Sequence, residues 1–166
     1  MRTQHILLVG LLALAVHGAN TKTEPNTNAP AAFQRLKSLV GEWQANKQQK
    51  SKVTYELVSG GTALLERETS DTMPVMLTLY HLDGDRLLLT HYCMAGNQPR
   101  MLGTFNPDAG TLQFQFLDAT NLKPGDGHMH NVSFRFVDND HFSSEWQFYE
   151  NGKQKFAEAA QYTRVR

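Results

Sequence analysis

The pattern that decides the fold is clearest in the stretch His128-Met-His-Asn-Val-Ser-Phe-Arg-Phe-Val137. From Val132 to Phe136 every second residue is apolar, and the residues between them are polar. A period of two predicts a β-strand with one face toward a core and the other toward water. His128 and His130 have the same parity as the apolar residues. The alternation therefore predicts two imidazole rings on the buried face at the start of this strand.

Nine further strand candidates are separated by turn sequences such as Asp83-Gly84-Asp85 and Asn151-Gly152. They cover residues 42–48, 52–58, 62–69, 75–81, 86–94, 100–105, 111–118, 141–149 and 153–165. Ten short strands joined in this way predict an all-β fold, an antiparallel up-and-down meander that closes into a barrel to remove its exposed edges. Before the first strand, apolar residues at helical spacing predict one short amphipathic helix over residues 31–40, ending at Gly41.

The N-terminal residues 1–19 are predicted to be a secretory signal peptide. Arg2 precedes an apolar run from Ile6 to Val16, and the small residues Gly18 and Ala19 follow as cleavage positions. The run is shorter than the roughly 20 residues that span a bilayer, so we expect no membrane insertion after cleavage. The expected location is periplasmic or extracellular. Residues 20–30 are polar and contain prolines, which predicts a disordered linker before a barrel domain at 31–166.

The composition excludes several classes of partner and chemistry. Lys plus Arg and Asp plus Glu both count 16, so no excess of charge points to nucleic acid. Cys93 is the only cysteine, so an internal disulfide is impossible and the core alone must stabilise the domain. The sequence contains no nucleophile elbow, phosphate-binding glycine loop or Cys-x-x-Cys pair.

The segment Leu39-Val40-Gly41-Glu42-Trp43 resembles the Gly-x-Trp motif that opens the first strand of the calycins, the lipocalin-like β-barrels. A short helix before ten strands is most similar to the nitrobindin-like and fatty-acid-binding-protein-like branches and to small exported bacterial domains of unknown function. The resemblance implies that a basic residue near the end of the last strand packs across the tryptophan, and Arg164 is the candidate partner of Trp43. Nitrobindin-like proteins ligate haem through a histidine near the C-terminal end. This chain has no histidine after His141, so the resemblance does not imply haem.

The alternating directions of a meander place two long connections, at 95–99 and 119–127, at the same rim of the barrel. Long loops at one end of a rigid barrel favour a binding site at its mouth. His91 has the parity of Leu87 and Leu89, so it is expected to face inward and to meet the two histidines of the 128–137 strand. The predicted ligand-binding residues at this mouth are His91, Cys93, Gln98, Arg100, His128 and His130.

Several interpretations of these residues stay open at this point. His91, His128 and His130 could chelate a divalent metal, line a polar cavity without metal, or be structural. Cys93 could be activated by a neighbouring imidazole or be a small buried hydrophobe, and we expect it to point inward and react slowly with bulky reagents. Arg100 could grip an anion or pair with an acidic residue across the rim.

The leading hypothesis for function is an exported lipocalin-like barrel that binds a small, partly apolar molecule at a histidine-rich mouth. The first alternative is a metal-dependent or histidine-based enzyme that uses His91, His128 and His130. The second alternative is a structural or interaction domain whose barrel has a solid core.

Overall fold

The computed structural model describes residues 28–46 and 51–166, which form one α-helix, one 3₁₀ turn and ten strands. The predicted signal peptide and most of the predicted linker lie outside the described residues. The elements are α1 (Ala29–Lys37), β1 (Gly41–Ala45), β2 (Ser51–Val58), η1 (Ser59–Gly61), β3 (Ala63–Ser70), β4 (Met76–Asp83), β5 (Arg86–Tyr92), β6 (Gln98–Asn106), β7 (Thr111–Thr120), β8 (His128–Phe136), β9 (His141–Glu150) and β10 (Lys153–Arg164).

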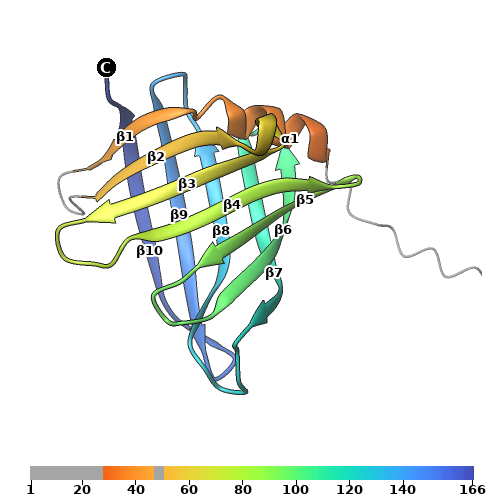
Figure 1. The fold of residues 1–166 in the computed structure, drawn as a ribbon, viewed down its shortest axis with the longest axis vertical. Coiled ribbons are helices and arrows are strands. Elements are labelled where there is room, and N and C mark those ends of the chain that lie inside the picture. The colour runs from red at the N-terminus through yellow and green to blue at the C-terminus, as the bar shows by residue number, and fades with distance from the viewer. Residues whose placement is uncertain (1–27, 47–50) are drawn as a thin grey trace, which may run out of the picture.

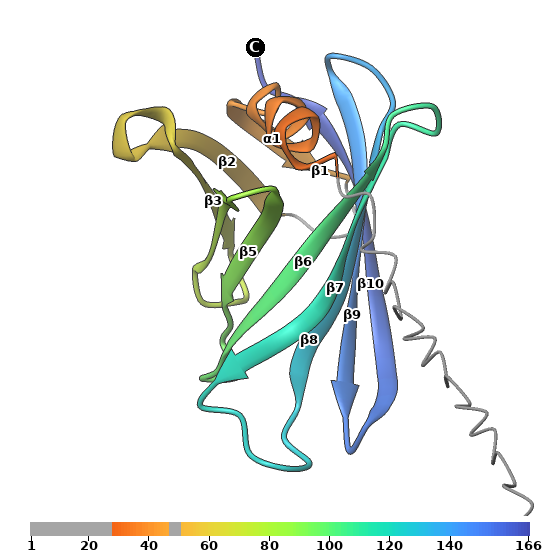
Figure 2. The same cartoon turned by 90° about the vertical axis from the view of Figure 1, so that its right-hand side faces the viewer.

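The ten strands form a closed antiparallel barrel in which each strand pairs with its neighbours in sequence and β1 pairs with β10 (Figure 1). All ten predicted strands and the meander order are confirmed. Turn residues and period-two alternation are local signals, and here every hairpin follows them. In a view turned by 90°, β2 to β5 form one wall and β6 to β10 the other (Figure 2). No helix within the described residues has the length and apolar character needed to cross a membrane.

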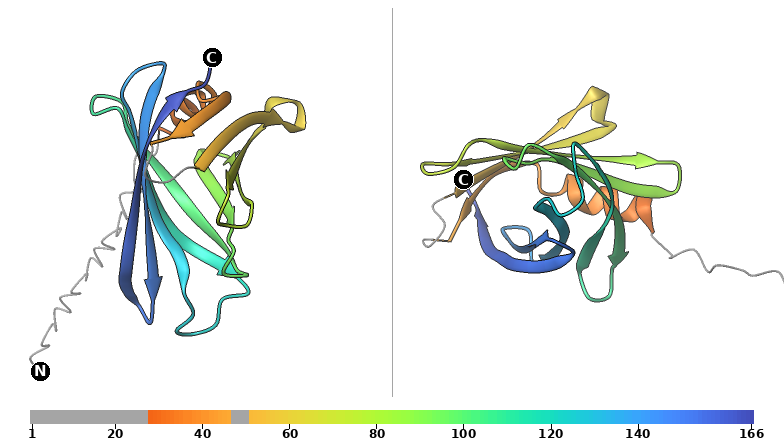
Figure 3. Two further views of the ribbon diagram at one scale, coloured as in Figure 1. Left: turned by 90° about the vertical axis from the view of Figure 1, so that its left-hand side faces the viewer. Right: turned by 90° about the horizontal axis from the view of Figure 1, so that it is seen from below.

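One end of the barrel is closed by α1, which packs against β4, β5 and β6. Seen from the opposite end, the helix lies across the far opening (Figure 3). Phe33 and Leu36 on its inner face are buried in the core. The helix begins at Ala29 with a proline in its first turn, so the predicted linker ends two residues too late.

The helix also ends three residues earlier than predicted, at Lys37. The reason is tertiary, because the carbonyl groups that follow are taken by side chains elsewhere in the chain. Trp43 donates its indole N–H to the Leu39 carbonyl at 2.6 Å, and Arg164 donates to the carbonyls of Ser38 and Val40 at 2.8 Å each. These contacts fix the turn between α1 and β1.

Trp43 is fully buried at this closed end, and the Arg164 guanidinium lies over its ring at 4.1 Å. The packing implied by the calycin resemblance is therefore present. Gly41 allows the Arg164 guanidinium to lie close to the backbone at the start of β1. Its φ is +123°, and a Cβ atom at this position would lie 3.1 Å from the Arg164 Nη1 atom.

Candidate functional site

The open end of the barrel carries the long connections, as predicted. The Asn97 side chain, between β5 and β6, donates to the Gly127 carbonyl before β8 at 2.8 Å. The backbone N–H of Asn151, between β9 and β10, donates to the Gly125 carbonyl at 3.2 Å. Three loops thus meet at one rim, at the lower end in Figure 2.

A bulge at the start of β8 changes which side chains enter the barrel. Met129 pairs with Phe148 and Asn131 pairs with Gln147, which leaves His130 as an extra residue without a partner. Met129 and Phe148 both line a cavity inside the open end. Strand alternation therefore places His128 and its partner Tyr149, one position further along, on the outer face of the sheet.

The rings of His128, His130 and Tyr149, joined by Phe116 from β7, form a cluster that we call the outer stack. The His130 ring lies between Phe116, with centroids 4.8 Å apart, and Tyr149, with centroids 4.2 Å apart. The His130 Nδ1 and His128 Nε2 atoms are 2.9 Å apart, so one ring donates a hydrogen bond to the other. Burial and the neighbouring His128 lower the pKa of His130, which favours the neutral form that such a bond needs.

His91 does not meet this pair, so the predicted convergence of the three histidines on one pocket is wrong. It lies inside the barrel, with its ring 4.8 Å from the Trp146 ring. Within residues 28–46 and 51–166 no group of three His, Cys, Asp or Glu side chains is arranged to hold a metal ion. The metal site and the enzyme built on His91, His128 and His130 lose their geometric basis. The three histidines do not converge because of the bulge in β8. The prediction assumed strict alternation along the strand, and the extra residue at the bulge breaks that alternation.

The other predicted mouth residues have different roles. Gln98 accepts hydrogen bonds from Thr120 and Asn121 in the rim. Arg100 is exposed and forms a bidentate pair with Asp118, one of the two alternatives considered for it. Cys93 lines the cavity at the open end, and burial raises the pKa of its thiol.

Two adjacent cavities lie toward the open end of the barrel, while the rest of the interior is filled by buried side chains. The mouth cavity has a volume of about 320 Å³ and an apolar wall rich in sulfur and aromatic rings. It is lined by Met73, Met76, Cys93, Met94, Ala95, Met129, Phe148, Phe156 and Glu158. Thioether side chains adapt to ligands of different shape, because they are unbranched and flexible.

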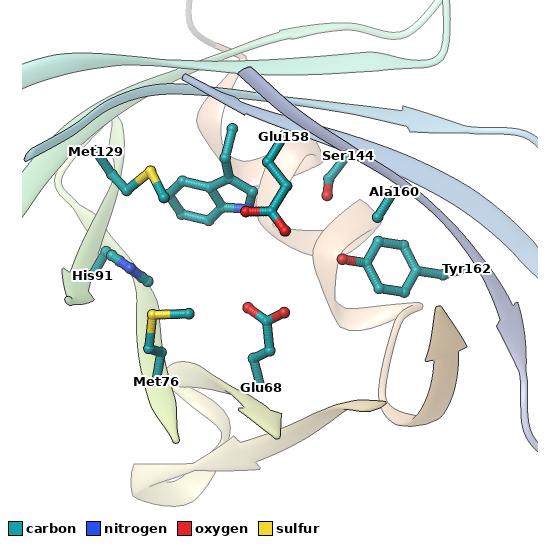
Figure 4. A pocket seen from close by; sticks show the side chains of 9 residues that line it. Glu68, Met76, His91, Met129, Ser144, Glu158, Ala160 and Tyr162 are labelled. Carbon is teal, nitrogen blue, oxygen red and sulfur yellow. The ribbon is translucent and has the colours of Figure 1, made fainter. Parts of the chain in front are cut away.

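Deeper in the barrel lies the inner chamber, with a volume of about 20 Å³. Its wall is more polar and is formed by Glu68, Met76, His91, Met129, Ser144, Trp146, Glu158, Ala160 and Tyr162. Met76, Met129 and Glu158 belong to both walls, so the chamber adjoins the mouth cavity. In Figure 4 the carboxyl groups of Glu68 and Glu158 and the hydroxyl group of Tyr162 point into one space, with the His91 ring at its edge.

Two hydrogen-bonded pairs of buried side chains lie on the inner faces of β5, β4 and β3. The His91 Nδ1 atom lies 2.9 Å from the Thr78 hydroxyl, and the Tyr80 hydroxyl donates to Glu66 at 2.5 Å. Burial raises the pKa of Glu66 to about 7, although its bonds to Tyr80 and Tyr55 oppose this shift. Burial lowers the pKa of His91 to about 4, so its ring is neutral at physiological pH.

Sequence reasoning missed the carboxyl groups of this interior. Leu64, Glu66 and Glu68 have one parity on β3, and all three side chains are turned toward the barrel interior, where Leu64 is fully buried. The same alternation that placed His91 inside therefore placed two glutamates there. Glu158 has the parity of the buried Ala160 and Tyr162 on β10, so the same alternation turns it inward.

The fold is similar to that of solved structures, although no family model and no curated protein matches the chain. Rv2717c from M. tuberculosis superposes with a TM-score of 0.55 at 18% identity, over 81% of this chain and 98% of that chain. A protein of unknown function from the DUF3598 family of Nostoc punctiforme gives a TM-score of 0.53 at 12% identity, over 78% of this chain and 49% of its own. At these identities the likeness concerns the barrel fold alone.

Proposed function

We propose that this protein binds a small, partly apolar molecule inside the barrel, with the apolar part in the mouth cavity and a polar end in the inner chamber. The observation that carries the proposal is the adjacency of the two cavities, one apolar and one polar, beneath the open rim. The volume of the mouth cavity, about 320 Å³, is at the lower end of the range for small-molecule sites. The histidine-rich mouth is replaced in this proposal by a methionine-rich mouth with one inner histidine.

Two wider parts of the proposal rest on the sequence. We propose that the barrel belongs with the lipocalin-like proteins, because a short helix, the Gly41-Glu42-Trp43 segment and Arg164 occur together at the closed end. Export is proposed from Arg2 and the apolar run that follows it. Barrels of this kind bury ligands because the interior is shielded from water while the rim stays open.

The proposal is tested with N-phenyl-1-naphthylamine, a neutral apolar dye whose fluorescence rises in apolar surroundings. We expect saturable binding to the purified protein with micromolar affinity. Phe156→Ser should weaken binding at least about fivefold, because Phe156 stacks on Phe148 in the wall of the mouth cavity with ring centroids 4.8 Å apart.

Val137→Ser is the matched control, since Val137 is exposed and follows β8 at the closed end of the barrel. It should leave dye binding unchanged. Absence of saturable dye binding, or equal weakening by both variants, would contradict a binding site in the mouth cavity.

A further inference from the structure

We infer that the ligand carries a primary ammonium group, which the inner chamber holds while the mouth cavity takes the apolar remainder. The inference rests on the proposed function, because it concerns the same two cavities. It narrows the ligand class to small lipophilic amines.

The charge of the chamber is the first argument. Glu68 on β3 and Glu158 on β10 direct their carboxyl groups into one space (Figure 4). The described residues that line the chamber include no lysine or arginine. Burial, together with the nearby Glu158, raises the pKa of Glu68, as expected when two carboxylates share a poorly solvated space. A positive ligand group would relieve this repulsion and form charge-assisted hydrogen bonds.

His91 provides an independent argument, because it is a buried side chain with an open hydrogen-bonding position. It is 4% exposed and lines the chamber, and its Nε2 atom has no partner. A buried polar atom without a partner costs free energy unless a ligand or water satisfies it.

The Thr78 hydroxyl occupies the other ring nitrogen of His91, since it lies 2.9 Å from the Nδ1 atom. An ammonium ligand requires the tautomer in which the His91 Nδ1–H group donates to the Thr78 oxygen. In this tautomer the lone pair of His91 Nε2 faces the chamber, as a third acceptor beside the two carboxyl groups.

The size of the chamber selects the kind of cation. Its volume of about 20 Å³ is close to what one water molecule needs. A primary ammonium group has a similar size and three N–H donors, which match the three acceptors. A trimethylammonium group is larger and has no N–H donor. A divalent metal is disfavoured because the described residues contain no metal-ligating group of three side chains.

The test is isothermal titration calorimetry of the purified protein at pH 7 with octylamine, octanol, octanoate and octyltrimethylammonium. Octylamine should bind at least tenfold more tightly than each of the others, since all four share the apolar chain. Glu68→Gln should weaken octylamine at least tenfold and change octanol less than twofold. Glu145→Gln, the same substitution at an exposed position of β9, should change neither.

The outcomes separate this inference from the proposed function. Octanol or octanoate binding as tightly as octylamine would overturn the ammonium assignment while the binding site in the barrel stands. Unchanged octylamine affinity in a Glu68→Gln protein with a normal thermal unfolding midpoint would overturn the placement of the head group. If that variant does not fold, the four octyl compounds on the wild-type protein decide the inference. Failure of all four compounds and of the naphthylamine dye would contradict the proposed function itself.

Discussion

The inner chamber and the outer stack lie at the same open end of the barrel and both contain histidine, but they differ in every property that matters for binding. His91 is buried among carboxyl groups with one ring nitrogen unsatisfied. His130 is held between two aromatic rings and bonded to His128. His128 and His130 thus share a hydrogen bond, whereas the Nε2 atom of the buried His91 has no partner. The spacing of His128 and His130 in the sequence correctly predicts that their rings are close together. It does not predict which face of the sheet they lie on, and that face determines whether they can line the cavities.

The largest expected effect tests the bulge that separates these two regions. Deleting His130 should leave a regular strand in which Met129 still faces inward, because His130 is the extra residue. We expect a loss of about 2 kcal/mol in the free energy of unfolding, from the two ring contacts. Deleting Ser133, which lies in the regular part of β8, should prevent folding or cost at least about 4 kcal/mol, because it turns part of the strand inside out.

Chemical denaturation of the two deletion variants measures both costs. A His130 deletion as damaging as the Ser133 deletion would show that β8 has no bulge, and would return the two histidines to the barrel interior.

The second prediction concerns the pH dependence of stability. Glu66 and His91, both buried inside the barrel, make contributions to it that change in opposite directions with pH. The pKa of Glu66 rises from 4.5 to about 7 on folding, so its contribution to stability falls as pH rises through that range. The pKa of His91 falls from 6.5 to about 4, so its contribution rises between pH 4 and 6.5. Glu66→Gln should therefore expose the His91 slope, a gain on the order of 3 kcal/mol from pH 4 to 6.5.

Urea unfolding of both proteins across that range measures this slope. The wild-type curve should be flatter, because the two contributions nearly cancel between pH 4.5 and 6.5. Parallel curves for wild type and Glu66→Gln would contradict the burial of an ionisable Glu66.

The third prediction compares alanine substitutions of the two kinds of histidine. His91→Ala should cost about 2–3 kcal/mol, because it leaves a cavity beside Trp146 and removes the partner of Thr78. It should also weaken octylamine at least fivefold. His130→Ala should cost about 1 kcal/mol and leave octylamine binding unchanged, since its ring lies on the outer face. Equal losses of octylamine affinity would remove the distinction between the regions.

The fold was predictable because its signals are local. Turn residues and alternation define ten strands, and a meander follows from their short connections. The residue at which α1 ends was harder to predict from the sequence, because it depends on contacts with Arg164, which lies far away in the chain. The bulge at His130 depends on the pairing of Met129 with Phe148 across two strands. Its only trace in the sequence is Met129 itself, an apolar residue on the face that otherwise carries Asn131 and Ser133.

Part of the inner chamber could have been predicted from the same alternation of residues along the strands. Glu66 and Glu68 alternate with the fully buried Leu64, so parity alone directs them inward. A buried carboxyl group is rare enough to mark a functional site. What parity does not give is the approach of Glu158 from the opposite wall, because that depends on closure of the barrel.

Protection of Cys93 tests most directly whether ligands enter the barrel rather than bind its outer face. Cys93 is the only thiol in the chain and lines the mouth cavity. Its alkylation by N-ethylmaleimide, followed by intact mass, should be slower in the folded protein than in denaturant, and saturating octylamine should slow it at least a further fivefold. An alkylation rate that octylamine leaves unchanged, at a concentration where calorimetry shows full binding, would contradict a ligand site inside the barrel.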